Sequence, residues 1–173
     1  FIRPRVRSTF GDLIYQYDYL VREGLLLGAL STAWPVLETA GQKSSLEYSG
    51  LRNIEGREMH ELKYRSRKGD QDFQVLLYFD SESFRHRRSK YRLRIGYVLG
   101  PDPIASSRLQ PTYVDILEEF DRFEKADGLT LPREYKLTLS VDEKERSIMM
   151  EWTVRIATVL HNQKVDPKYF VIR

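Results

Sequence analysis

The fold is decided by the stretch Phe84-Arg85-His86-Arg87-Arg88-Ser89-Lys90-Tyr91-Arg92-Leu93-Arg94-Ile95. Six of these twelve residues are Arg or Lys, yet Tyr91, Leu93 and Ile95 recur at every second position. Side chains alternate between the two faces of a β-strand, so this period indicates one apolar face and one cationic face. The sequence therefore predicts a half-buried strand here, not a disordered basic tail.

Segments with the same alternation lie on both sides of this strand. They cover residues 46–54, 57–67 and 72–79 before it, and residues 112–125, 135–141 and 148–156 after it. Turn signals such as Glu55-Gly56 and Asp127-Gly128 separate them. The segment 72–79 is apolar on both faces, which is typical of a central strand. We expect about seven strands in a large, curved antiparallel sheet, or half-barrel.

The first 45 residues differ from the rest, because their apolar residues are interrupted by Gly24, Gly28 and Pro35. We interpret this segment as two short helices that end near Gly41 and cover the concave face of the sheet. The result is an α+β fold in a single domain of residues 1–173, with a helical lid (1–45) and a sheet (46–173).

A sheet covered by apolar helices can leave a hydrophobic cavity suited to a lipid or acyl chain. The residues expected to form the lid over this cavity are Leu25, Leu26, Leu27, Leu30, Trp34 and Leu37. The residues expected to form its wall are Phe73, Val75, Leu77, Phe79, Leu137, Leu139, Met150 and Trp152. A packed core is the competing interpretation for each of them.

Composition narrows the class of protein. The chain has 173 residues, 41% of them hydrophobic and 31% charged, with a net charge of +3, which is ordinary for a globular domain. It contains no cysteine, which excludes disulfides and Cys-based metal sites. No apolar run is long enough for a transmembrane helix. Because the chain starts at Phe1 without a signal-peptide pattern, we expect a mature or trimmed form.

Residues that could support catalysis do not form a recognisable motif. We expect His60 to be a partly buried structural residue and His86, surrounded by arginines, to pack at the surface. His161 is expected to pack in a C-terminal tail. Adjacent Glu118 and Glu119 would point to opposite faces of a strand, and a solvated face is their default interpretation. We therefore predict no enzyme, no cofactor and no metal site.

The cationic strand allows three interpretations. Its arginines could pair with carboxylates such as Glu118, Glu119 and Asp121 on a neighbouring strand. They could instead form a docking surface for an acidic protein or anionic headgroups. The residues of that surface would be Arg85, Arg87, Arg88, Arg92 and Arg94. Nucleic acid is the weakest alternative, because the total charge is nearly balanced and no nucleic-acid motif is present.

Four short motifs resemble those of the bacterial lipoprotein carrier (LolA-like) family. They are a hairpin at residues 51–64, a turn at 77–84, the run Phe123-Glu124-Lys125-Ala126-Asp127-Gly128-Leu129-Thr130-Leu131-Pro132, and a closing segment at 162–170. The resemblance implies a half-barrel capped by helices, a periplasmic location and binding of lipoprotein acyl chains or other lipids. The match is best to the C-terminal part of that family.

Two functions follow as expectations. The first is a non-enzymatic periplasmic domain that binds a lipid or the acyl chain of a lipoprotein. The alternative is a cell-envelope interaction module with a packed core and a cationic docking face. Neither involves nucleic acid.

Overall fold

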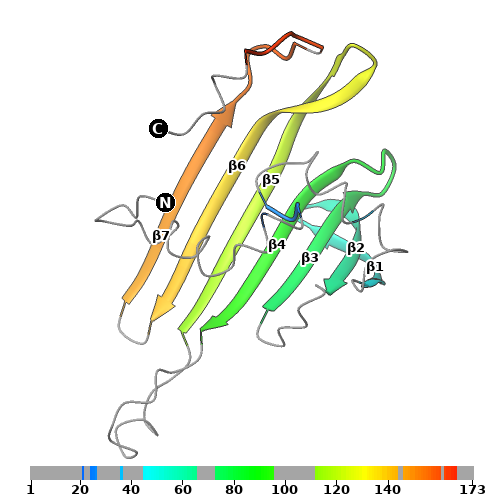
Figure 1. Ribbon diagram of the computed structural model, residues 1–173. Helices are drawn as coiled ribbons and strands as arrows, with labels where there is room; N and C mark the ends of the chain where they lie inside the picture. Colours follow the sequence, from blue (N-terminus) through cyan, green and yellow to red (C-terminus); the bar gives the residue numbers. More distant parts are fainter. Residues whose placement is uncertain are drawn as a thin grey trace, which may run out of the picture.

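The computed structural model describes residues 21, 24–26, 36, 45–65, 73–95, 112–143, 146–160 and 162–166. These residues form one antiparallel sheet whose seven strands are paired in chain order, each with the next (Figure 1). The strands are β1 (Ser45–Ile54), β2 (Arg57–Arg65), β3 (Phe73–Asp80), β4 (His86–Ile95), β5 (Thr112–Ala126), β6 (Leu129–Glu143) and β7 (Arg146–Arg155). The predicted antiparallel sheet is thus confirmed, and every strand lies close to its expected place except β6, which begins at Leu129 and not at Tyr135.

The predicted α+β class is wrong for the described part of the chain. Only Val21 and Val36 have helical backbone there, and no helical element covers the sheet. Gly24 explains part of the difference, because its φ of 73° breaks a helix and its N–H closes a turn onto the carbonyl of Val21. Of the expected lid, Leu27, Leu30, Trp34 and Leu37 lie outside the described residues.

Two tight turns set the register of the long hairpins. Glu55 and Gly56 both have positive φ (52° and 81°), as do Asp127 and Gly128 (47° and 84°). Positive φ at both central residues is the requirement of a type I′ turn, whose twist matches that of the flanking strands. The β5–β6 hairpin consequently keeps its pairing from Tyr113↔Asp142 to Ala126↔Leu129 and extends past the ends of β3 and β4 (Figure 1).

One face of the sheet, here called the inner face, carries the hydrophobic core. The register aligns Val75, Tyr91, Ile116 and Leu139 in one row across β3 to β6. Leu25 and Leu26 pack against these rows. The core residues are Leu25, Leu26, Tyr64, Val75, Leu77, Tyr91, Leu93, Val114, Ile116, Leu137, Leu139 and Val141. Each large side chain removed from water in this way stabilises the fold by about 1.5–3 kcal/mol.

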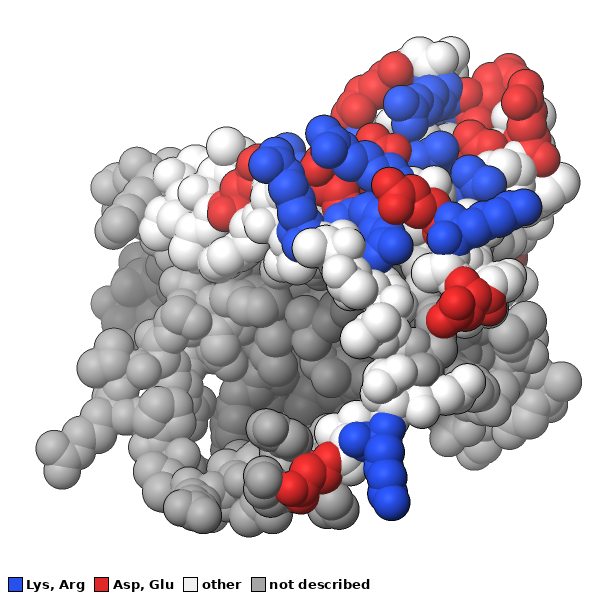
Figure 2. Space-filling view, turned by 90° about the horizontal axis from the view of Figure 1, so that it is seen from above, with Lys and Arg blue, Asp and Glu red and all other residues white. Residues whose placement is uncertain are grey.

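The opposite, outer face is polar. Figure 2 shows Lys and Arg side chains interleaved with Asp and Glu over one part of the surface, with no large area of a single sign. Tyr78, on the outer side of β3, is nevertheless buried. Burial and the neighbouring Glu61 raise the pKa of Tyr78 to about 12. A central strand covered on both sides is what the apolar pattern of residues 72–79 predicts.

Candidate functional site

A buried carboxylate lies in the middle of the inner face. Glu118 on β5 is 0% exposed, and its two oxygens accept hydrogen bonds from the Tyr91 and Tyr135 hydroxyls, both at 2.7 Å. Burial, together with the charge of Glu118, raises the pKa of both tyrosines, so both hydroxyls keep their protons and donate. The solvated position expected for Glu118 is therefore wrong, whereas the prediction that Glu118 and Glu119 face opposite sides is confirmed.

His86 is also buried, at 9% exposure, and not at the surface as expected. Its ring stacks on Phe79 and contacts Phe120 at centroid distances of 5.0 and 4.8 Å. The Nε2 atom lies 2.9 Å from the Ser89 hydroxyl and 3.1 Å from the carbonyl of Arg88. Burial lowers the pKa of His86 to about 4, so the ring is neutral at pH 7.

This group brings a serine, a histidine and a carboxylate onto one face, but not in a catalytic arrangement. A triad needs the carboxylate to orient the second nitrogen of the histidine. Here Glu118 is bound by two tyrosines, and Nδ1 of His86 has no hydrogen-bond partner among the described residues. Ser89 and Glu118 are also completely buried. We assign the group a structural role inside the core.

The arginines of β4 are mostly neutralised by their neighbours. Arg87, and Arg85 just before the strand, place their guanidinium groups over the ring of Phe123, at 4.8 and 5.4 Å. Arg87 forms an ion pair with Asp121 (2.7 Å), Arg88 with Glu55 (2.8 Å) and Glu119 (2.5 Å), and Arg92 with Asp115 (3.1 Å). The interpretation that pairs these cations with Glu119 and Asp121 is therefore confirmed.

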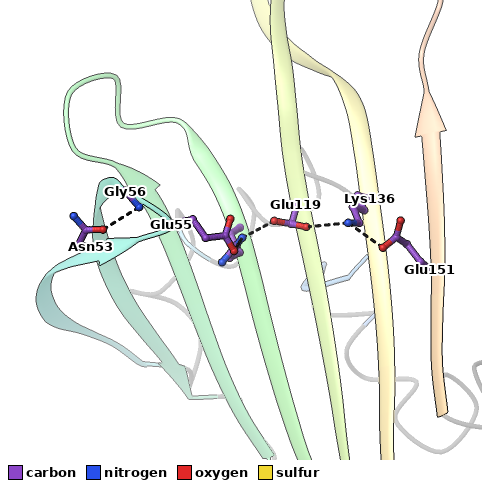
Figure 3. A network of polar contacts seen from close by, with 7 residues as sticks. Asn53, Glu55, Gly56, Glu119, Lys136 and Glu151 are labelled. Carbon is purple, nitrogen blue, oxygen red and sulfur yellow. Dashed lines mark hydrogen bonds and ion pairs between the residues drawn. The ribbon is translucent and has the colours of Figure 1, made fainter. Parts of the chain in front are cut away.

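These contacts belong to a longer chain of alternating charges, here called the ion-pair ladder. It runs from Glu55 through Arg88, Glu119 and Lys136 to Glu151 on β7 (Figure 3). The Lys136–Glu119 and Lys136–Glu151 distances are 3.9 and 2.9 Å. The hydrogen bond and charge of Arg88 lower the pKa of Glu55. An outer face balanced in this way does not present a uniformly cationic docking surface.

Two hollows on the outer face, of about 220 and 390 Å³, both border Ile54 and Arg88. The wall of the first is largely polar, whereas the wall of the second mixes polar and apolar groups, so neither is the apolar cavity between sheet and helices that was expected. The expected wall residues lie on the inner face, where four are fully packed with Leu25 and Leu26: Val75, Leu77, Leu137 and Leu139. Phe73, Phe79 and Met150 are partly buried at the margin of this core.

The inner face does not end where the core ends. Along β7 and just past it, Trp152, Val154 and Ile156 continue the inner-face alternation, but they are 39%, 50% and 36% exposed. We call these three residues the β7 strip. Trp152 pairs with Leu137 and Val154 with Tyr135 in the register, so the strip directly adjoins the core. Of the expected site residues that the structure describes, Trp152 is the one that lies in an accessible apolar surface.

Within the described ranges, no group of three or more His, Cys, Asp or Glu side chains could hold a metal ion. The described residues also contain no helix with the length and apolar character needed to cross a membrane. Comparison with protein-family models, with curated proteins and with solved structures found no match to this chain.

Proposed function

We propose that this protein binds an apolar ligand, the acyl chain of a lipid or lipoprotein, on the β7 strip, and that it does so without catalysis. The observation that carries the proposal is the exposure of Trp152, Val154 and Ile156 beside a core of buried side chains. A contiguous exposed apolar surface is a typical interaction site. The periplasmic setting is part of the proposal and rests on the resemblance to lipoprotein carriers.

The proposed site differs from the cavity expected from the sequence. The ligand lies along an open strip at one side of the sheet, since Val75, Leu77, Leu137 and Leu139 are already covered by other side chains. Binding is then driven by removal of acyl methylenes from water, at about 0.8 kcal/mol for each fully buried CH₂. Affinity for fatty acids should consequently rise with chain length, by up to about fourfold per methylene.

Delipidated protein titrated with saturated fatty acids of increasing length, by displacement of a fluorescent fatty acid, tests this proposal. Val154→Asp is expected to weaken binding by at least about tenfold, because a carboxylate would face the acyl chain without a partner. Met149→Asp is the matched control, since Met149 lies on the outer face of the same strand and is 72% exposed. Absence of uptake, or equal losses in the two variants, would reject the site.

The alternative is an interaction module with a packed core. The packing of Leu25 and Leu26 against the sheet favours it, whereas the pairing of the β4 arginines with carboxylates weakens the idea of a cationic docking face. In the titration, a folded protein that takes up no fatty acid at any chain length would favour this alternative.

A further inference from the structure

The outer edge of β7 presents backbone groups that can pair with another strand. The N–H of Ile156 donates to the carbonyl of Arg133 at 2.8 Å, so in this regular stretch the even-numbered residues bond to β6. The N–H and C=O groups of odd-numbered residues, such as Glu151, Thr153 and Arg155, therefore point away from β6. Within the described ranges, no strand pairs with this edge. An edge of this kind is a template for strand addition.

The edge is complementary to itself in one register. When two antiparallel copies of β7 are paired about Thr153, Glu151 of each copy lies opposite Arg155 of the other. Trp152 then lies opposite Val154 on the inner face. Opposite charges and apolar side chains placed directly across from each other stabilise a strand pair by about 0.2–1 kcal/mol each.

The neighbouring registers that also place the odd-numbered residues of the two copies opposite one another lack this match. Centring the pair on Glu151 would place two carboxylates face to face. Centring it on Trp152 would oppose Glu151 to Thr153, and centring it on Val154 would oppose Arg155 to Thr153. Like charges directly opposite are destabilising, and the other two registers leave the charges unpaired. Thr153 is therefore the preferred centre.

The ion-pair ladder supports the same register. Its last member on β7 is Glu151, which lies 2.9 Å from Lys136, while Arg155 lies 3.3 Å from Glu134 (Figure 3 shows the Glu151 end). A second copy would add its Arg155 next to Glu151. The ladder would then continue across the junction as Lys136, Glu151, then Arg155 and Glu134 of the second copy, with alternating sign.

We infer that β7 is a homodimerisation edge, at which two copies of this chain pair about a two-fold axis at Thr153 and join their sheets into one. Residues directly opposite in an antiparallel pair point to the same face, so both inner faces lie on the same side. The two β7 strips then become neighbours. This inference is independent of whether the strip binds a lipid.

The mass of the protein in solution gives the first test, by light scattering after size-exclusion chromatography. Wild-type protein is expected to be a dimer and Thr153→Pro a monomer, because proline removes an edge N–H without affecting the bonds to β6. Thr153→Val retains the N–H and should remain a dimer. A monomeric wild type, or a dimer that survives Thr153→Pro in a folded protein, would overturn the inference.

Cysteine crosslinking tests the register and does not depend on the proline variant. The chain has no native cysteine. Thr153→Cys should form an intermolecular disulfide under mild oxidation, because hydrogen-bonded antiparallel partners have Cα atoms about 5.5 Å apart. Glu151→Cys alone should not crosslink, whereas a mixture of Glu151→Cys and Arg155→Cys proteins should. Equal crosslinking of the Thr153→Cys and Glu151→Cys proteins would contradict the proposed axis.

Discussion

Replacement of Glu118 by alanine is expected to lower the free energy of unfolding by about 3–5 kcal/mol. The variant removes an acceptor that serves the Tyr91 and Tyr135 hydroxyls, both at 2.7 Å, at a position with no exposed surface. A buried donor left without an acceptor costs about 1–3 kcal/mol, and the missing side chain also leaves a void. Urea unfolding followed by circular dichroism measures the loss.

Two comparisons separate this effect from simple loss of a charge. Glu124→Ala removes a carboxylate of the same strand that is 64% exposed and paired with Arg133, and should cost no more than about 1 kcal/mol. A double-mutant cycle of Glu118→Ala with Tyr135→Phe isolates the hydrogen bond. A coupling energy near zero, or equal losses for the Glu118 and Glu124 variants, would show that the buried network does not stabilise the fold.

Acidification from pH 7 to pH 5 is expected to remove roughly 2 kcal/mol of stability through His86. Its pKa is lowered by burial from 6.5 to about 4, so the unfolded chain takes up a proton at a higher pH than the folded protein does. The contribution of His86 is therefore complete above pH 6.5 and is lost as the pH falls towards 4. At pH 5 the unfolded chain is protonated at this residue and the folded protein is still neutral.

The variant His86→Phe keeps the aromatic contact with Phe79 and Phe120 but has no titrating group. Its stability should change less than that of the wild type between pH 7 and pH 5. The comparison uses this interval because Asp80 and Glu55, whose pKa values are lowered by Ser83 and Arg88 respectively, stay ionised there. The same pH dependence in both proteins would mean that another group is responsible.

The strands could be predicted from the sequence because the period of two and the turn residues agree. Glu55-Gly56 and Asp127-Gly128 mark turns that the backbone confirms through their positive φ values. The exception is the start of β6, expected at Tyr135 but found at Leu129. The additional residues 129–134 form the end of the β5–β6 hairpin. They include Pro132, and proline is normally unfavourable in a strand.

The buried polar residues were missed for two different reasons. Glu118 lies at every second position with Val114, Ile116 and Phe120, so the alternation puts it on the inner face, although its charge suggested the surface. His86 could not be placed in this way, because a register shift near Tyr78 and Phe79 changes the alternation at the start of β4. Such a bulge depends on the pairing with β3 and has no local signal in the sequence.

The helical lid was predicted from apolar content, which does not distinguish a helix from an irregular segment that packs on a core. Leu25 and Leu26 are indeed buried against the sheet, but they lie directly after the turn at Gly24. These two residues pack directly on the core and cover this part of the inner face. The β7 strip, by contrast, is an accessible apolar surface.

Photo-crosslinking with a diazirine-bearing fatty acid measures the location of the ligand directly. After irradiation and proteolysis, mass spectrometry should find the adducts concentrated at residues 152–156, and the Val154→Asp protein should lose them. Adducts confined to the region of Val75, Leu77, Leu137 and Leu139 or to the outer face, or the absence of adducts, would contradict binding at the β7 strip.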